Sequence, residues 1–320
     1  MVTEKKQSLQ NIKGCLILCF ASLIWGVAFV AQAEAADKIP PFLLNSLRSF
    51  VSALFLFGFL LIRKTARGTP ILPQTKETRK PWLQSGLLCG LLLTVSVNFQ
   101  QFGLAAYPAD VASEARAGFL TALYVILVPL LSILFGKRLR LILLPAVALA
   151  LVGVYLLCLS DGLGSFHAGD ALVLLCALSF SFHILTVDRF SESVDGVLLS
   201  ATQFLVCGVF SGILFLIFET STAAAIVSAL PQILYLGILS GGVGYTLQIV
   251  GQRYAEPTVA SLSMSLESVF AALGGWLISG NVLSGREWLG CGLVFAAIVL
   301  AQLPVRVFRK KSLKNSADRM

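Results

Sequence analysis

Charged side chains are scarce in this chain of 320 residues. Asp, Glu, Lys and Arg together make up 12% of it, whereas an average soluble domain contains about 25%. Hydrophobic residues reach 57%, and the mean hydropathy is +0.87. A soluble domain of this length has no interior large enough to bury so much apolar surface, so lipid must serve as a second solvent. The composition therefore excludes a soluble globular protein.

Groups that bind metals or carry redox chemistry are also few. The chain has 2 histidines and 7 cysteines, and each cysteine lies inside an apolar run without a C-x-x-C pair. Apolar surroundings favour a packing role for these thiols. The phosphate-binding pattern G-x-x-x-x-G-K-[ST] does not occur in the sequence, which argues against ATP as an energy source. We therefore expect no metal and no cofactor.

Apolar segments of roughly 20 residues, the length a helix needs to cross a bilayer, follow one another along the chain. They cover residues 14–34, 41–62, 82–105, 112–135, 140–159, 169–187, 196–218, 230–252, 257–279 and 286–304. The sequence thus predicts an all-α polytopic membrane protein with ten transmembrane helices. The basic start of the first segment imitates a signal peptide, but the apolar run that follows is longer than such a peptide has, so we expect it to be retained.

Basic residues are distributed unevenly over the loops of this topology. Of 24 Lys and Arg residues, 20 fall on one side and only Lys38 and Arg286 on the other, while Arg48 and Arg116 lie inside apolar segments. Cytoplasmic loops carry such an excess. We expect a multi-pass protein of the plasma (inner) membrane with both termini in the cytoplasm. Because topology explains the net charge of +8, we expect the lipid bilayer as partner and no nucleic acid.

The chain divides near residue 165 into two halves of five apolar segments each. Aligning Gly14 with Gly169 sets CLILCFASLIWG against DALVLLCALSFS, and residues 121–139 lie against 265–283 without a gap. Because five is odd, the two copies would insert in opposite senses, as the inverted repeats of many secondary transporters do. Chance similarity between segments rich in Leu and Ala is the alternative. We expect one five-helix repeat over 1–164, a second over 165–305, and a basic cytoplasmic tail over 306–320.

Several segments carry polar side chains at helical spacing, which places these side chains on one face. Such a face either lines a cavity or forms hydrogen bonds from helix to helix. Trp25, followed by Gly26, could stack against an apolar or cationic part of a substrate, or serve packing alone. The candidates for a substrate site are Trp25, Asn45, Arg48, Asn98, Gln101, Tyr124, Gln203, Gln248 and Glu267.

Charged groups inside apolar segments are the most informative, because each is costly in a membrane unless it is paired or reaches water. Arg48 could hold a substrate carboxylate with its two-pronged guanidinium, or form a permanent salt bridge to Glu114 or Glu267. Glu267 could couple protons or recognise an amine, or be purely structural. His183 could relay protons, or be a satisfied core histidine. Glu114 and Arg116 are candidates for a gate or an interfacial ion pair.

Three stretches of this sequence resemble the EamA-type families of the drug/metabolite transporter superfamily. They are LIWGVAFVAQ (23–32), EARAGFLTALYVILVPLLSILFGKRL (114–139) and SLESVFAALGGWLISGNVLS (265–284). The resemblance implies a ten-helix carrier in which the first four helices of each repeat surround a substrate cavity, with the fifth packed outside. Ser268 stands where many relatives have Pro, which weakens the expectation of a kink in the ninth helix. Asn281 stands where an acidic residue usually ends that helix.

From these observations we expect a secondary transporter, as a monomer or homodimer, and no enzyme. The resemblance implies export of a small polar metabolite, such as an amino acid or a related compound, by alternating access. An intramembrane enzyme is one alternative, but Ser165 near His167 lacks the nucleophile elbow that would activate it. A membrane scaffold or signalling protein is another, but the loop 63–80 and the short tail leave little chain to carry a signal.

Overall fold

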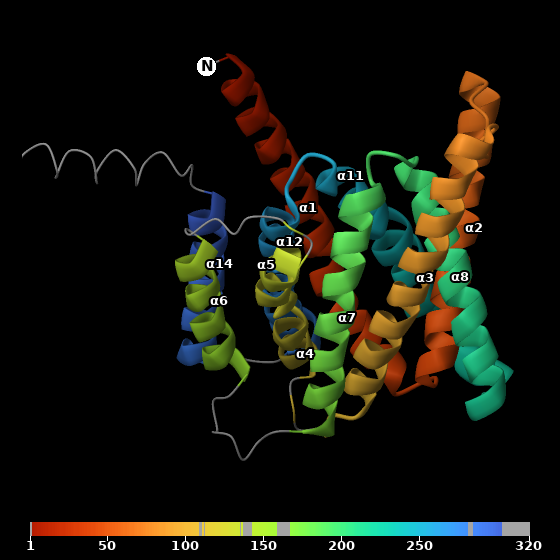
Figure 1. Cartoon of the computed structure of the whole chain (residues 1–320). Coiled ribbons are helices and arrows are strands. Elements are labelled where there is room, and N and C mark those ends of the chain that lie inside the picture. Colours follow the sequence, from red (N-terminus) through yellow and green to blue (C-terminus); the bar gives the residue numbers. More distant parts are fainter. Residues whose placement is uncertain are drawn as a thin grey trace, which may run out of the picture.

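The computed structural model describes residues 2–108, 111, 113–134, 136, 143–158, 167–280 and 284–302. Within these ranges every regular element is a helix, which confirms the all-α prediction (Figure 1). Ser165, Asn281 and the predicted tail 306–320 lie outside the described residues. The helices are α1 (Val2–Ala36), α2 (Pro41–Arg67), α3 (Lys76–Ala105), α4 (Ser113–Thr121), α5 (Tyr124–Leu134), α6 (Leu143–Cys158), α7 (Ala168–Phe190), α8 (Gly196–Phe218), α9 (Ala223–Ser228), α10 (Leu230–Leu234), the π-helical η2 (Tyr235–Gly244), α11 (Tyr245–Gln252), α12 (Pro257–Met264), α13 (Leu266–Ser279) and α14 (Gly285–Gln302).

Local sequence signals mark the ends of several helices. Pro41 opens α2, where its fixed φ suits the first turn and its missing N–H is no loss. Gly68 follows that helix with φ 65°, a left-handed conformation that glycine adopts without strain. At the start of α7, the Asp170 side chain accepts the backbone N–H of His167 at 2.7 Å. The carboxylate thereby satisfies one of the free donors of a helix N-terminus.

Helices α2 and α8 lie antiparallel and are held together at both ends. Glu219, one residue beyond α8, accepts the backbone N–H groups of Phe42 and Leu43 at 3.1 Å each and so caps α2. Burial raises the pKa of the Glu219 carboxyl above its ordinary value. At the other end, Arg63 of α2 forms a 2.8 Å ion pair with Asp195, the N-cap of α8. The pair thus connects the two halves of the chain.

In the described part of the chain, 8 helices are long and apolar enough to cross a membrane. They are Gln10–Ala36, Pro41–Arg67, Lys76–Ala105, Ser113–Leu134, Ala168–Phe190, Gly196–Phe218, Leu230–Gln252 and Pro257–Ser279. These correspond to eight of the predicted segments. The fifth and tenth are represented by shorter apolar helical stretches, Leu144–Gly153 and Trp288–Ala297.

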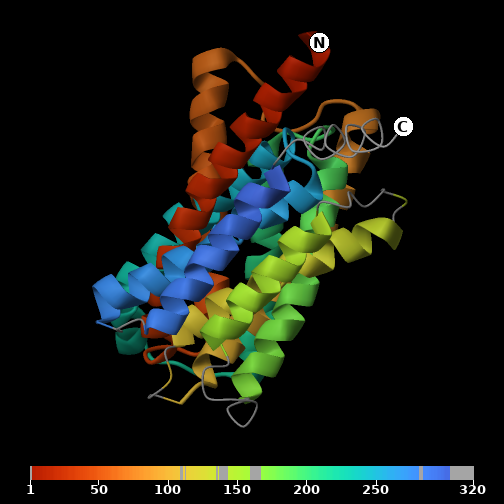
Figure 2. The ribbon, with the colours of Figure 1, turned by 90° about the vertical axis from the view of Figure 1, so that its left-hand side faces the viewer.

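The two shorter apolar helices, α6 and α14, stand apart from the main bundle. They pack along each other at one edge of the molecule (Figure 1). Figure 2, seen from that edge, shows α14 in blue lying against α6 in yellow-green. They reach the other helices through α4 and α5 on one side and through α12 and α13 on the other. The remaining helices form a bundle of their own.

Two of the candidate spans are interrupted near their middle. The span Ser113–Leu134 is broken between α4 and α5, and Pro257–Ser279 is broken at Ser265, between α12 and α13. The Ser268 hydroxyl donates to the Ser265 carbonyl at 2.7 Å. Serine hydroxyls that bond back to the preceding turn bend helices. The ninth predicted helix is therefore interrupted even though Ser268 stands in the place of a proline.

Large apolar side chains lie on the outer surface of the bundle, and many polar side chains are buried inside it. Large side chains such as Leu54, Leu134 and Leu216 are mostly exposed, while Asn45 and Gln203 are fully buried. This arrangement suits a chain surrounded by acyl chains, because lipid accepts the apolar surface and the interior satisfies the polar groups. The polar faces predicted from helical spacing thus point between helices rather than outward.

Candidate functional site

A cavity lies inside the bundle, and its walls come from both halves of the chain. Of the residues predicted for a substrate site, Trp25 (α1), Arg48 (α2), Tyr124 (α5), Gln248 (α11) and Glu267 (α13) line it. Its volume is about 50 Å³, well below the roughly 300–1,000 Å³ of ligand pockets. A metabolite of the size that such pockets hold would fit only if the helices around this cavity moved apart.

Arg48 supplies a buried cation to the cavity wall. Its side chain is 7% exposed, and its Nη1 donates to the Gln32 Oε1 atom at 3.0 Å. Within the described residues no carboxylate lies within 4.0 Å of its guanidinium. The permanent salt bridge to Glu114 or Glu267 is therefore absent from this conformation. A guanidinium has five N–H donors in a fixed fork, so most of the binding capacity of Arg48 remains available.

Glu267 supplies a carboxyl group to the wall of the same cavity. It lies in the first turn of α13, directly after the interruption at Ser265, and it is 6% exposed. The Tyr124 hydroxyl, at the start of α5, donates to its Oε1 atom at 2.9 Å. Both interrupted spans thus present a polar side chain to the cavity at the point where they break. Breaks of this kind free helix termini and polar groups for a ligand in many transporters.

Aromatic rings form much of the remaining wall. The rings of Trp25 and Tyr245 meet edge to face with centroids 4.9 Å apart, and Phe204 meets Tyr245 in the same way at 5.2 Å. The Trp25 indole N–H donates to the Ser240 carbonyl of η2 at 3.3 Å. The π-helical η2 departs here from the regular α-helix, and π-helical irregularities are frequent at functional sites. The cavity therefore combines a guanidinium and a carboxyl group with apolar, aromatic surface.

Other predicted site residues of the first half lie off the cavity and join helices. The Asn45 amide donates to the Val97 carbonyl at 3.0 Å and to the Asn98 Oδ1 atom at 2.8 Å. Asn98 in turn donates to the Ser211 hydroxyl at 3.0 Å. Gln101 donates to the Gln32 carbonyl at 3.0 Å. In this conformation these amides act as the helix-to-helix connections that the alternative interpretation describes.

In the second half, His183 and Gln203 form a buried pair. The His183 Nε2 atom lies 3.0 Å from the Gln203 Oε1 atom, and both side chains have no exposed surface. The His183 Nδ1 and Gln203 Nε2 atoms have no hydrogen-bond partner among the described residues. The pair holds α7 to α8, and neither residue reaches the cavity wall. The contacts correspond to a core histidine with one of its two ring nitrogens satisfied.

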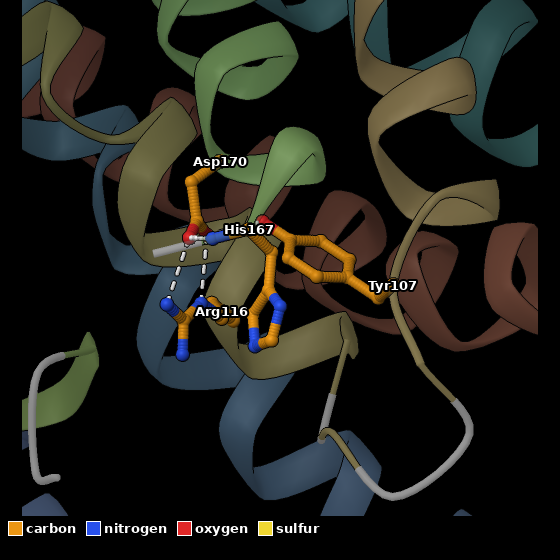
Figure 3. A network of polar contacts seen from close by, with 4 residues as sticks. All are labelled: Tyr107, Arg116, His167 and Asp170. Carbon is orange, nitrogen blue, oxygen red and sulfur yellow. Dashed lines mark hydrogen bonds and ion pairs between the residues drawn. The ribbon is translucent and has the colours of Figure 1, made fainter. Parts of the chain in front are cut away.

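A network of polar contacts joins the two halves at the end of the bundle where α3 ends and α7 begins (Figure 3). Arg116 donates from Nε and Nη2 to the two carboxylate oxygens of Asp170, both at 2.7 Å. The Tyr107 hydroxyl and the His167 backbone N–H add further bonds of 2.8 and 2.7 Å. Asp170 thus accepts two hydrogen bonds on each oxygen, which makes this a saturated, charge-assisted contact.

Glu114, the other residue predicted for a gate, contacts a different helix. Its Oε1 atom accepts the Ser279 hydroxyl at 3.1 Å, which joins the start of α4 to the end of α13. Arg116 and Glu114 therefore connect α4 to α7 and α13 respectively. Both residues lie near the start of the fourth predicted segment, 112–135. This is the end at which the sequence predicted a gate or an interfacial ion pair.

An apolar layer lies between the Arg116–Asp170 network and the cavity. Phe29 belongs to the layer and also lines the cavity, whereas Tyr107 packs against the layer and also bonds to Asp170. The layer therefore connects the two features in space. Its buried members, contributed by α1, α3, α4, α7 and α13, are Phe29, Leu104, Ala117, Val173 and Ala271.

Sequence reasoning missed some residues of the cavity and the network. Gln32 bonds to Arg48 and lines the cavity, and Asp170 is the partner of Arg116. Gln32 lies seven residues after Trp25, a spacing that places both on one helical face, and this signal could have found it. Nothing in the local sequence pairs Asp170 with Arg116, because the two are distant along the chain.

Comparison with known proteins places this geometry in a family. The EamA-like transporter family matches residues 12–159 and again residues 167–303. An uncharacterized transporter of Archaeoglobus fulgidus is 28% identical over 93% of this chain and 89% of its own. The uncharacterized inner membrane transporter YedA of Escherichia coli K12 is 26% identical over 90% of each chain. A solved crystal structure with 23% identity covers 90% of this chain and 97% of its own with a TM-score of 0.71, which shows the same fold.

An all-helical bundle with an apolar exterior, many buried polar side chains and these relatives defines a multi-pass membrane transport protein. The chain belongs to the EamA-like transporter family, within the drug/metabolite transporter superfamily, and it contains two copies of the family's repeat. The predicted family is thereby confirmed. Family membership favours a transporter over an enzyme.

Proposed function

We propose that the protein is a secondary carrier that exports a small polar metabolite, such as an amino acid or a related compound, by alternating access. It would lie in the plasma (inner) membrane with both termini in the cytoplasm. The single observation that carries the proposal is the placement of buried Arg48 and buried Glu267 on the walls of one cavity. Burying two ionisable groups that do not pair with each other is costly, and a ligand that pairs with both would offset the cost.

The proposed architecture is ten transmembrane helices in two inverted repeats, 1–164 and 165–305, with α6 and α14 as the fifth and tenth. The pairing of helices supports this. Helix α3, the third of the first repeat, packs on α7, the first of the second repeat. In the same way η2 and α11, the third of the second repeat, pack on α1, the first of the first repeat. Helix α2 packs on its counterpart α8, and α6 packs on its counterpart α14. Exchange of partners in this manner is expected from two repeats related by a two-fold axis.

Two glutamines support the same symmetry at the level of side chains. Gln101, near the end of α3, donates to the Gln32 carbonyl of α1 at 3.0 Å. Gln252, at the end of α11, donates to the Ile184 carbonyl of α7 at 3.0 Å. Each bond joins the third helix of a proposed repeat to the first helix of the same repeat.

In the proposed site, Arg48 binds the carboxylate of the substrate and Glu267 binds its amine. Gln32 would release Arg48 as the carboxylate arrives, because a charged acceptor forms the stronger hydrogen bonds. Tyr124 orients Glu267, Gln248 adds an amide, and Trp25 packs against the apolar part of the molecule. A solute with both charges and an apolar portion matches this set of groups.

The other predicted residues are proposed to meet the substrate when the cavity expands. Asn45, Gln101 and Gln203 each have a buried polar atom without a partner among the described residues. Such an atom is free to bond to a ligand or a water molecule. Asn98 accepts a hydrogen bond from Asn45 and so positions it.

Closure of the site is proposed to involve the contacts of Arg116 and Glu114. The Arg116–Asp170 pair and the apolar layer around Phe29 would keep the outer end shut while the inner end opens. The outward step would break these contacts and separate α4 from α7. If transport is coupled to protons, Glu267 or His183 would carry them, because both are titratable groups buried in the bundle.

The function can be tested with the purified full chain in proteoliposomes. Loaded with an equimolar mixture of the twenty standard amino acids, the vesicles should lose one or a few of them faster than protein-free liposomes do, as measured by mass spectrometry. Vesicles containing Arg48→Ala should lose none above that background. An enzyme would convert a solute, and a scaffold would move none. Retention of every amino acid inside the vesicles would therefore contradict the proposal that the protein carries amino acids.

A further inference from the structure

A groove separate from the cavity lies at the end of the molecule where α1 begins and α2 connects to α3 (Figure 1). Its volume is about 470 Å³, within the range of about 300–1,000 Å³ found for ligand sites. The walls are the end of α2, the loop 68–75, the start of α3 around Trp82, and residues 193–198 at the start of α8. Both halves of the chain therefore contribute to it.

The wall of the groove carries a cation that no described residue neutralises. Arg63, Arg67 and Asp195 are the charged residues of its wall. Asp195 is engaged by Arg63 at 2.8 Å and by the backbone N–H of Leu198 at 3.0 Å. Among the described residues, Arg67 has no hydrogen-bond or ion-pair partner, and it shares the wall with the Thr69 hydroxyl. The groove thus offers a free guanidinium to an anion.

The groove also lies at the boundary between polar and apolar surface. Leu61 and Ile62, just before Arg63 in α2, are 55% and 67% exposed, and Leu83, just after Trp82 in α3, is 52% exposed. These side chains provide an apolar surface beside the polar wall. The Trp82 indole donates to the Thr202 hydroxyl at 2.9 Å, which fixes the ring at this level. Tryptophan is enriched where a membrane protein meets the lipid headgroups.

We propose that this groove is a binding site for the headgroup of an anionic phospholipid. The lipid phosphate binds the Arg67 guanidinium, and the acyl chains extend along Leu61, Ile62 and Leu83. A guanidinium matches a phosphate with paired N–H donors. Free phosphate has the same oxygens, but it has no apolar part to contact the adjoining apolar surface. Basic pockets at this level of a membrane attract anionic lipids. The bound headgroup contacts both halves of the chain.

Native mass spectrometry of the purified full chain tests this site. The protein in non-ionic detergent is titrated with phosphatidylglycerol or with phosphatidylcholine of the same acyl chains. We expect one phosphatidylglycerol to bind more tightly than phosphatidylcholine. Arg67→Gln should weaken that binding at least tenfold, because it removes the charge and its paired hydrogen bonds to the phosphate. Lys64→Gln and Arg79→Gln remove the same charge from exposed positions outside the groove, and they should bind as the unaltered chain does.

Three results would overturn the site. Equal affinity for the two lipids would remove the role of headgroup charge. Losses in Lys64→Gln or Arg79→Gln as large as in Arg67→Gln would indicate a diffuse attraction of the whole basic segment. Displacement of the lipid by inorganic phosphate would indicate a site for the free anion. Arg67→Lys is a second variant that keeps the charge, and it should retain more affinity than Arg67→Gln because it loses only the paired geometry.

Discussion

Two arginines inside apolar segments, Arg116 and Arg48, have very different surroundings. Arg116 meets both oxygens of Asp170 at 2.7 Å, whereas Arg48 donates to the neutral amide of Gln32 at 3.0 Å. The first charge is neutralised by the protein itself and joins helices. The second is buried with most of its donors available, which is the condition of a group that waits for a ligand.

The acidic residues show the same contrast. Asp170 accepts hydrogen bonds from Arg116, Tyr107 and the His167 backbone, while Glu267 accepts one from Tyr124. A saturated carboxylate holds a structure in place, and an unsaturated one can exchange partners. The comparison therefore separates ionisable groups that the protein itself satisfies from those that we propose to bind the substrate. In the sequence, both kinds are simply charged residues within apolar segments.

The largest effect is expected at the cavity. Arg48→Ala or Glu267→Gln should abolish efflux from proteoliposomes, because each removes one of the two groups that we propose to pair with the substrate. Expression, membrane insertion and the elution volume in size-exclusion chromatography should stay unchanged. Arg79→Ala removes an exposed arginine and serves as the control, with full activity expected. Full activity of both cavity variants would assign Arg48 and Glu267 a structural role.

The next largest effect is expected from breaking the ion pair between Arg116 and Asp170. Arg116→Gln or Asp170→Asn leaves a buried charge without its partner, which costs about 3–5 kcal/mol where both groups are fully buried. The closed outer end should open more often. A cysteine introduced on the cavity wall by Ser240→Cys should then react at least tenfold faster with a membrane-impermeant maleimide added from outside. The exchange Arg116→Asp with Asp170→Arg should slow the reaction again, and no change in any of these variants would contradict a gate.

A smaller effect is expected from the hydroxyl that orients Glu267. Tyr124→Phe removes the 2.9 Å hydrogen bond to the carboxylate and leaves the ring in place. One such bond is worth about 1 kcal/mol, so the apparent affinity for the transported amino acid should fall about fivefold. A loss as complete as that of Glu267→Gln would mean that Tyr124 itself contacts the substrate.

The smallest effect on transport is expected at Asn98, which joins α3 to α2 and α8. Asn98→Ala leaves Asn45 and Ser211 without their partner. We expect a loss of about 1–3 kcal/mol in the free energy of unfolding and a change in apparent affinity smaller than that of Tyr124→Phe. Thermal unfolding and efflux measured on the same preparation check both parts. A large loss of affinity at unchanged stability would place Asn98 in direct contact with the substrate.

Much of the fold could be predicted because a bilayer imposes a simple length and polarity rule on each helix. The α2 helix illustrates this, since an apolar run after Pro41 and the basic residues before Gly68 mark its two ends. The helices α6 and α14 follow this length rule less closely. Their apolar stretches are shorter than a full span, and composition alone does not tell how a short apolar helix meets the bilayer.

The candidate site could be predicted only in part. Helical spacing identifies the polar face of a helix, and in this way it selects Arg48 and Gln248, which do line the cavity. The same spacing selects Asn45 and Gln203, which bond to neighbouring side chains instead. Which group faces a cavity and which meets a partner depends on contacts between distant segments, and periodicity within one helix contains no information about them.

The most direct test of the alternating-access proposal is accessibility of the cavity from both faces of the membrane. The Ser240→Cys variant is reconstituted, and a membrane-impermeant maleimide is added to right-side-out or to inside-out vesicles, with the unaltered chain as background. We expect labelling of the introduced cysteine from either face, with rates that change when the transported amino acid is present. Labelling from one face only, or from neither, would contradict a carrier that opens to each side in turn.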